Sequence, residues 1–365
     1  MRIPIIITYY KNLSILLHCL SNLKETLEKT EIETEVLIIN DNPSEKLENN
    51  ISIKNILQDC IIIDCDINRG YAGACNFAVE RIDSELFVLL DSDIMVTDGW
   101  IKNMYNTITS HPNAGAVSSI ILNMEDNTVL HMGFGTYKID MIKPFVFRPI
   151  NQIPASILKS DFVSPTLTSG CCLINKQAYL QVGGMDSQLY NGYCDLDLFY
   201  KFDEQNYENY VCSKSFVFHR GCVSGEVRNR KKQDTKALFC SKWGQKNIKE
   251  GLEMLKSLYQ YNTISLTNSK YILFDFCQSL FSSEYIEQII ESIFDIEYTY
   301  KINISGTSKI ILEDYISLSL QRSKFDFIYF CDCYKDLTDN YHWFTSRYGY
   351  NDKIIDRNGN IIDLK

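Results

Sequence analysis

Short runs of β-branched residues alternate with helical patterns over the first 120 residues of the chain. Such alternation is typical of parallel strands joined by crossover helices. Leucines at three- and four-residue spacing from Leu13 to Leu27 predict a helix over residues 12–29 that covers the sheet. Buried strands are predicted over residues 3–8, 36–40, 61–64, 86–91 and 116–121. The pattern therefore indicates an α/β fold with a mainly parallel, Rossmann-like sheet flanked by helices.

The pattern becomes irregular between residues 123 and 164, where glycines and prolines interrupt any long element, so we expect loops and short strands there. Regular elements resume over residues 162–175. Helices are predicted over residues 72–81, from Asp98 to about residue 111, over 176–182 and over 194–205, and a strand over 211–219.

The amino-acid composition changes beyond residue 251, where Tyr, Phe, Ile and Asp dominate and proline is absent. We expect a boundary between about residues 245 and 268, with one domain over 1–250 and a smaller α/β or helical module over 251–365. In this module, helices are predicted over 283–294 and 312–321, and strands over 271–276 and 325–330.

Composition narrows the class of protein. The hydrophobic fraction of 45% and charged fraction of 22% are those of a globular chain, and the net charge of −10 argues against nucleic-acid binding. The thirteen cysteines include no Cys-x-x-Cys pair, and no signal peptide precedes the first strand, so we expect a cytoplasmic protein without a structural zinc. No apolar stretch approaches the roughly 18 residues of a membrane span, which leaves peripheral contact as the form of membrane association.

The carboxyl ends of the predicted strands carry the candidate chemistry, because ligands of open parallel sheets bind there. The strand over residues 86–90 leads directly into Asp91-Ser92-Asp93. Two carboxylates so placed suit a Mg²⁺ or Mn²⁺ that also holds phosphate oxygens. Alone, an Asp-x-Asp triplet is equally typical of an ordinary turn.

A second candidate, Asn68-Arg69-Gly70, follows the third strand and opens a helix whose amide dipoles favour an anion. Arg69 could add a contact to a diphosphate. Helix-packing glycines in a loop are the alternative. The segment is neither a Walker loop nor a dinucleotide motif, since both spacings are missing.

A third candidate comprises Ser169-Gly170-Cys171-Cys172, Gly183-Gly184-Met185-Asp186 and Asp195-Leu196-Asp197. A carboxylate at a helix start, across a pocket from a metal diphosphate, could deprotonate a hydroxyl nucleophile. An acidic first helical turn that complements the helix dipole explains Asp195 and Asp197 equally well.

These motifs, in this order over about residues 3–245, resemble the inverting glycosyltransferases of family 2, which have the GT-A nucleotide-diphospho-sugar fold. The resemblance implies that Asp195 is the catalytic base and that Asp93 and His219 bind the metal, Mn²⁺ or Mg²⁺. It also implies donor-binding roles for Thr8, Tyr10, Asp41, Asn68, Arg69, Gly70, Asp91 and Ser92.

Two positions depart from the family pattern. Cys194 stands where relatives often have Glu, which leaves the choice between Asp195 and Asp197 open. At the second strand, Asn40-Asp41-Asn42 replaces the common Asp-Asp pair, so one carboxylate near the nucleoside is missing.

Two further segments have less specific signals. The basic run over residues 228–232 follows His219, where related enzymes often have a mobile lid; a solvated loop is the alternative. The tail faintly resembles the second half of a methyltransferase-like domain without its glycine-rich loop. We expect the tail to serve acceptor recognition or homo-oligomerisation.

The resemblance implies transfer of a sugar, with inversion, from a nucleotide-sugar donor to a glycan or protein acceptor, with a UDP-sugar as the preferred donor. Two other functions fit parts of the pattern. A nucleotide-sugar binding module would retain Arg69 and Asp93 but tolerate the loss of Asp195. A sugar-phosphate nucleotidyltransferase would need a glycine-rich loop after Ile7, which this chain lacks.

Overall fold

The structure is a computed structural model that describes residues 2–124, 129–138, 144–147, 160–190, 192–219, 232–244, 246, 271–275, 298–303, 326–331, 353–356, 358 and 360–362. The chain divides into two compact units, Met1–Asn262 and Thr263–Lys365. The first unit contains all the predicted site residues.

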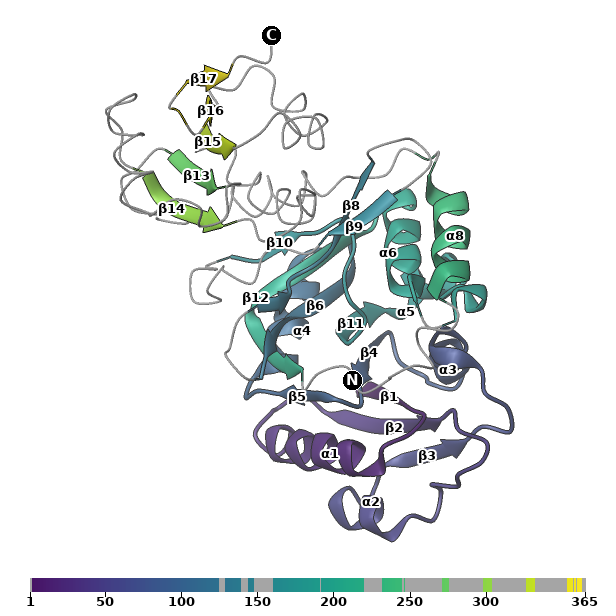
Figure 1. The fold of residues 1–365 in the computed structure, drawn as a ribbon. Helices are drawn as coiled ribbons and strands as arrows, with labels where there is room; N and C mark the ends of the chain where they lie inside the picture. Colours follow the sequence, from purple (N-terminus) through teal and green to yellow (C-terminus); the bar gives the residue numbers. More distant parts are fainter. Residues whose placement is uncertain are drawn as a thin grey trace. The chain divides into compact units, whose positions relative to one another are not determined.

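A ten-stranded sheet forms the centre of the first unit (Figure 1), in the order β10-β12-β6-β11-β4-β1-β2-β3 with β5 and β7 attached beside it. Its parallel half consists of β1 (Ile3–Tyr9), β2 (Thr34–Asn40), β3 (Ile61–Asp64) and β4 (Leu86–Asp91). The strands β6 (Ala114–Asn123) and β12 (Glu208–His219) run in the same direction, while β11 (Cys171–Asn175) runs against its neighbours. The prediction of a mainly parallel α/β sheet is confirmed.

Short strands complete the sheet. They are β5 (Ile94–Val96), β7 (Val129–His131) and β10 (Phe162–Val163), and all three pair antiparallel. A separate two-stranded ribbon joins β8 (Gly135–Lys138) to β9 (Pro144–Phe147). Except for β5, these elements are the short strands expected between residues 123 and 164.

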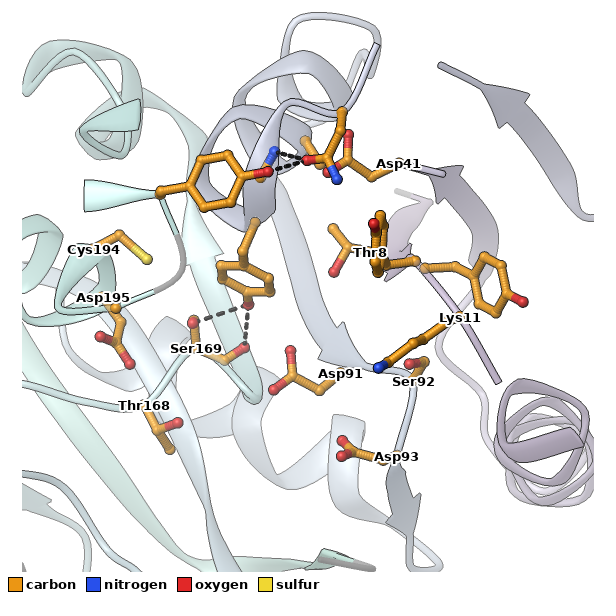
Figure 2. A pocket seen from close by; sticks show the side chains of 18 of the residues that line it. Thr8, Lys11, Asp41, Asp91, Ser92, Asp93, Thr168, Ser169, Cys194 and Asp195 are labelled. Carbon is orange, nitrogen blue, oxygen red and sulfur yellow. Dashed lines mark hydrogen bonds between the residues drawn. The ribbon is translucent and has the colours of Figure 1, made fainter. Parts of the chain in front are cut away.

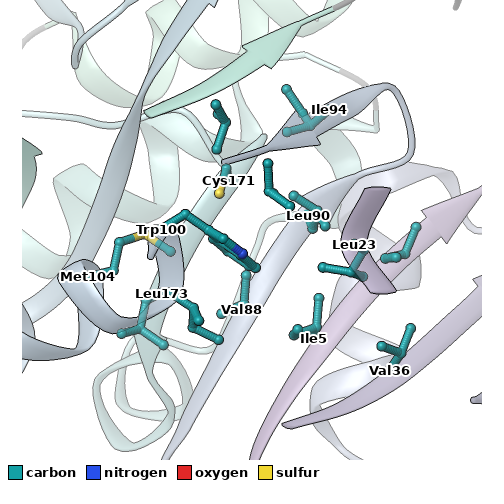
Figure 3. Close-up of a cluster of buried hydrophobic side chains, with 14 of the residues drawn as sticks. Ile5, Leu23, Val36, Val88, Leu90, Ile94, Trp100, Met104, Cys171 and Leu173 are labelled. Atoms are coloured by element: carbon teal, nitrogen blue, oxygen red, sulfur yellow. The ribbon is translucent and has the colours of Figure 1, made fainter. Parts of the chain in front are cut away.

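Three helices cover one face of the sheet: α1 (Leu13–Leu27), α2 (Ile51–Ile56) and α4 (Trp100–Ser110). Their apolar side chains join alternate residues of the strands in one buried cluster, in which Leu23, Trp100 and Met104 pack against Ile5 and Val88 (Figure 3). Because the side chains of a strand alternate between faces, the remaining strand residues form a second apolar face.

The opposite face is covered by α3 (Gly70–Val79), α5 (Lys176–Gln181) and α6 (Cys194–Glu204), which contact β1, β11 and β12 respectively. Phe87 of β4 meets Tyr179 of α5 edge to face, with ring centroids 5.3 Å apart. A single turn of 3₁₀ helix, η2 (Ser187–Leu189), and the helix α8 (Lys232–Trp243) lie on this side, in contact with each other.

The second unit contains a five-stranded sheet of order β14-β13-β15-β16-β17. Its strands β13 (Tyr271–Asp275), β14 (Tyr298–Asn303), β15 (Asp326–Cys331) and β16 (Lys353–Asp356) are parallel, and β17 (Ile361–Ile362) is antiparallel. Strands occur where the sequence predicts them at 271–276 and 325–330. The helices predicted over 283–294 and 312–321 lie outside the described residues.

The sequence pattern misses two short elements of the first unit. The helix α2 has only six residues and β5 only three, so neither is long enough to display a hydrophobic period. The helix predicted over residues 72–81 begins earlier, at Gly70, which has a positive φ of 68°. In the described residues of the first unit and the second, no helix has both the length and the apolarity to cross a membrane.

Gly183 and Gly184 lie in the loop between α5 and η2, which packs closely against Asn76 of α3. Gly184 has φ 68°, and a Cβ atom placed on it would lie 2.5 Å from Asn76 Oδ1 and 2.9 Å from Tyr179 Cε1. Asn76 accepts hydrogen bonds from Tyr179 Oη (2.5 Å) and the Met185 amide (3.0 Å), and it donates to the Met185 carbonyl (2.8 Å). Asn76 and Gly184 therefore form a brace between α3 and the loop that precedes η2.

We predict that Gly184→Ala destabilises the first unit far more than Gly183→Ala. Both glycines have positive φ, so both substitutions carry a conformational cost of about 1–2 kcal/mol. Only at Gly184 does the new methyl group also collide with neighbours, because no atom lies within 4 Å of a Cβ at Gly183. Urea denaturation of the two variants measures the difference, and equal midpoints would contradict the brace.

Candidate active site

The parallel strands bring the predicted donor-binding residues to one edge of the sheet. Thr8 of β1 lies opposite Asp91 of β4, and Tyr9 lies opposite Asn40 of β2. The Asp41 amide continues the ladder by donating to the Tyr9 carbonyl (2.7 Å). Residues far apart in the sequence thus end side by side because their strands are in register.

A pocket of about 250 Å³ opens at this edge (Figure 2). Its walls are the ends of β1 and β4, the first turn of α3, the loop before β11, and the segment that leads into α6. All the sequence-predicted site residues except Arg69 line it, namely Thr8, Tyr10, Asp41, Asn68, Gly70, Asp91, Ser92, Asp93, Asp195 and His219.

Asp41 is only 5% exposed. Its Oδ1 accepts a hydrogen bond from the Arg69 amide at 2.7 Å. Burial raises the pKa of Asp41 to about 6, although the Arg69 and Gly70 amides and the Arg69 charge act to lower it. The carboxylate is therefore ionised at neutral pH, and because it is ionised in a buried position it lowers the stability of the folded state.

Arg69 is not among the residues that line the pocket. Its guanidinium carbon lies 4.3 Å from the centre of the Phe77 ring, a cation–π contact within α3 and its N-terminus. Lys11, which sequence reasoning did not single out, lines the pocket instead, and Figure 2 shows its side chain reaching toward Ser92. The exposed lysine after Tyr10 has no distinguishing sequence pattern, which is why it was missed.

Asp93 and His219 meet at one side of the pocket. The antiparallel pairing of β12 with β5 places His219 opposite Ile94, the residue after Asp93. As a result, His219 Nε2 lies 3.3 Å from Asp93 Oδ2, with both side chains mostly buried. Among the described residues, no group of three or more His, Cys, Asp and Glu side chains is placed to hold a metal ion, and the metal-binding role of the Asp93–His219 pair stays a prediction.

The two aspartates at the start of α6 have different surroundings. Asp195 lines the pocket, and its Oδ1 accepts from the Leu196 amide at 2.9 Å. Asp197 has no exposed surface and is bound by two lysines and a tryptophan behind the pocket. Two residues along a helix correspond to a rotation of about 200°, so the side chains point to opposite sides.

Cys194 adds no charge to the pocket. It is buried, and desolvation, together with the nearby Asp195 charge, raises the pKa of its thiol well above the usual value. The thiol stays neutral at physiological pH. The position where relatives often carry Glu is therefore apolar in this chain.

Tyrosines that the sequence analysis did not predict also shape the pocket. Tyr71 donates a hydrogen bond to Ser169 Oγ at 2.9 Å and so joins α3 to the loop before β11. The Tyr190 hydroxyl donates to Asn68 Oδ1. A Cβ atom on Gly70 would lie 2.5 Å from the Tyr190 ring, so glycine is needed there for both space and its positive φ. Of the basic run over residues 228–232, residues 228–231 lie outside the described residues, and a lid there stays a prediction.

We predict that Asp41→Asn stabilises the protein at pH 7.5. The folded-state pKa of about 6 exceeds the unfolded value of about 4, so ionised Asp41 destabilises the folded state above pH 6. Asn is neutral, and we expect a gain on the order of 2 kcal/mol at pH 7.5 that disappears below about pH 4. Denaturation across this pH range measures it, and a loss of stability at pH 7.5 would contradict the burial argument.

Asp64→Asn is the matched control with the opposite sign. Burial alone would raise the pKa of Asp64. Hydrogen bonds from Asn40 and from the Leu47 and Glu48 amides outweigh burial and lower this pKa below its usual value. Its carboxylate therefore stabilises the fold above about pH 4, and this contribution is lost as the pH falls through the lowered pKa. The substitution should destabilise the protein at pH 7.5.

Comparison with known proteins relates this pocket to an enzyme family. The family model described as Glycosyl transferase family 2 matches residues 5–183. A curated relative, the teichoic acid poly(glycerol phosphate) polymerase of Staphylococcus epidermidis, is 33% identical over 128 residues. That match covers 30% of this chain and 17% of the relative, so this chain spans a small part of the relative's length.

Several solved structures are similar in fold. GalNAc-T7 with UDP, GalNAc and Mn²⁺ has a TM-score of 0.49 at 16% identity, and the match covers 61% of this chain and 43% of that one. The mannosyltransferase PcManGT from Pyrobaculum calidifontis, in complex with GDP-Man and Mn²⁺, has a TM-score of 0.47 at 13% identity, with 68% and 65% covered. TarS of S. aureus has a TM-score of 0.45 at 14% identity, with 72% and 43% covered. The family assignment rests on the sequence match, which identifies residues 5–183 as a glycosyl transferase family 2 domain.

Proposed function

We propose that this chain is a metal-dependent inverting glycosyltransferase that moves a sugar from a nucleotide-diphospho-sugar to an acceptor hydroxyl. The observation that carries the proposal is the pocket itself. Asp93 and His219 meet at one side of it, Asp91 and Asp195 also line it, and the family 2 match covers residues 5–183. A UDP-sugar is the preferred donor.

The nucleoside of the donor would lie near β1 and β2. Thr8, Tyr10 and Asp41 border this end of the pocket, and Asn68 with Gly70 supplies the start of α3. The Asp41 carboxylate is held by the Arg69 amide, so its free lone pairs can accept an N–H from a base. The diphosphate would then lie toward Asp91, Ser92 and Lys11.

Mn²⁺ or Mg²⁺ would be held by Asp93, whose carboxylate oxygens suit such ions, with the His219 imidazole as a second ligand beside it. When bound, the cation supplies charge that stabilises the departing diphosphate. Asp91 and Ser92 lie within the same turn and keep the diphosphate end of the pocket polar.

Asp195 is the proposed general base. It takes the proton from the acceptor hydroxyl as the new bond forms at the anomeric carbon, while the bond to the diphosphate breaks and its electron pair leaves with the phosphate oxygen. Attack from the side opposite the leaving group inverts the configuration. Asp197 is unsuited to this role because its carboxylate is enclosed and paired with Lys201 and Lys242.

The acceptor we propose is a hydroxyl on a surface glycan or on a protein Ser or Thr. A curated relative is described as a teichoic acid polymerase, which favours the glycan. A binding module without catalysis and a nucleotidyltransferase remain the alternatives, and the activity test below distinguishes them.

We predict that purified protein with Mn²⁺ transfers sugar from at least one nucleotide sugar of a donor panel, and that Asp195→Asn lowers the rate at least about 100-fold with little change in nucleotide binding. The matched control is Glu204→Gln at the other end of α6, which forms an exposed pair with Lys246 and should leave the rate unchanged. Turnover that survives Asp195→Asn would exclude Asp195 as base, and binding without any turnover would favour the module. Release of pyrophosphate from a nucleoside triphosphate and a sugar phosphate would favour the nucleotidyltransferase.

We predict that Lys11→Met weakens binding of the nucleoside diphosphate by about tenfold, because it removes a lysine charge from the pocket. Lys24→Met, at an exposed lysine near the end of α1, is the charge-matched control. Titration calorimetry with UDP and Mn²⁺ measures both. Since Arg69 packs on Phe77, an Arg69→Met variant should bind the diphosphate more tightly than Lys11→Met, and the reverse order would contradict this assignment.

A further inference from the structure

A buried group of charges lies behind the pocket, on the far side of α6 from Asp195. Asp197 has no exposed surface. Its Oδ1 lies 2.6 Å from Lys242 Nζ, and its Oδ2 lies 3.2 Å from Lys201 Nζ. Lys242 also pairs with Asp186 at 3.2 Å. Two aspartates and two lysines therefore balance one another within this network, which we call the α6–α8 network.

The network joins three parts of the chain. Asp197 and Lys201 belong to α6, Lys242 belongs to α8, and Asp186 caps η2 by accepting from the Gln188 amide. Trp243, which is fully buried, donates from Nε1 to Asp197 Oδ1 at 2.9 Å. The Lys201 ammonium also donates to the Gly184 carbonyl. The last turn of α8 is thereby fixed to the first turn of α6.

A second contact links α8 to the pocket wall. The ring of Phe239 in α8 stacks on Tyr193, with centroids 5.0 Å apart. Tyr193 lines the pocket, has a positive φ of 63°, and accepts at its carbonyl from the Asp197 amide at 2.9 Å. A tyrosine in this conformation requires support from its surroundings. Phe239 and the network therefore hold the residues on both sides of Asp195.

We propose that Asp197 and Lys242 are positioning residues, which orient Asp195 toward the pocket by tying α6 to α8. The proposal rests on the function proposed above, because it assigns these residues to the acceptor-activating step. Neither residue lines the pocket, so neither touches a substrate there. They act through the backbone of residues 193–197.

The charge balance suggests how to separate positioning from simple stability. Burial lowers the pKa of Lys242, but the hydrogen bonds and charges of Asp197 and Asp186 outweigh this and raise it, so Lys242 is an ammonium at neutral pH. Removing one member of a buried pair leaves the other charge uncompensated, whereas removing both is often nearly neutral for stability. The double variant thus loses the tie but keeps the network neutral, because Lys201 and Asp186 remain with one charge of each sign.

The experiment compares Asp197→Asn, Lys242→Met, Lys242→Arg and the double variant Asp197→Asn/Lys242→Met in the full chain. Lys102→Met is the matched control, because Lys102 also pairs with a carboxylate, that of Glu31 at 2.9 Å, but at the surface and outside the network. Three quantities are measured for each protein: kcat and donor KM of transfer with Mn²⁺, thermal stability, and hydrogen exchange of the amides of residues 193–197.

We expect kcat of the double variant to fall 10- to 100-fold with donor KM within about twofold of wild type, since a small displacement of a catalytic group costs rate. Its thermal stability should recover relative to the single variants while kcat does not. Exchange of the Asp197 amide should accelerate, whereas exchange in α3 should not. Lys242→Arg, which keeps the charge, should retain most of kcat, and Lys102→Met should match wild type in every measurement.

Two results would overturn the positioning role. In the first, kcat recovers together with stability in the double variant; in the second, donor KM rises as much as kcat falls. If the wild type transfers no sugar at all, the proposed function fails. Hydrogen exchange then tests by itself whether the network fixes residues 193–197. Faster exchange at residues 193–197 in the double variant would support the tie, and unchanged exchange would refute it.

Discussion

The register of β1 with β4 and β2 is the constraint on which the pocket depends. It places Thr8 opposite Asp91 and Tyr9 opposite Asn40, so that the polar residues of three strands begin at one edge. A slip of one residue would turn each side chain to the other face of the sheet. The register is fixed because these strands are buried on both faces, and any shift would expose apolar groups or bury polar ones. The hydrophobic core thus determines where the chemistry lies.

This dependence explains how much of the site the sequence could predict. The end of a buried strand is visible in sequence as the step from Leu90 to Asp91, so both the sheet and its polar edge were predicted. The position of His219 beside Asp93 required the family resemblance, because the antiparallel pairing of β5 with β12 joins segments that the local pattern cannot relate. Short elements such as α2 and β5 gave no period to detect.

The orientation of charged side chains was less accessible from the sequence. Arg69 lies in a motif that favours anion binding, yet its guanidinium packs on Phe77 and it does not line the pocket. Lys11, without any motif, lines it. The resemblance favoured Asp195 but left the choice between Asp195 and Asp197 open, and their surroundings in the structure distinguish them: Asp195 lines the pocket, whereas Asp197 is bound by Lys242 and Trp243 of another helix. Identical side chains two positions apart thus have different surroundings because a helix turns between them.

The negative charge of the pocket couples binding of the proposed cation to binding of the proposed donor. Asp41, Asp91, Asp93 and Asp195 line it, and in the described part of the chain Lys11 is the lysine among the lining residues. A pocket with this excess of carboxylates repels a diphosphate unless a cation accompanies it. If the chain takes the donor proposed above, the affinities for cation and diphosphate must rise together, because coupling between two bound ligands is reciprocal. The net charge of −10 acts in the same direction, so the proposed donor would bind this acidic chain most tightly together with a divalent cation.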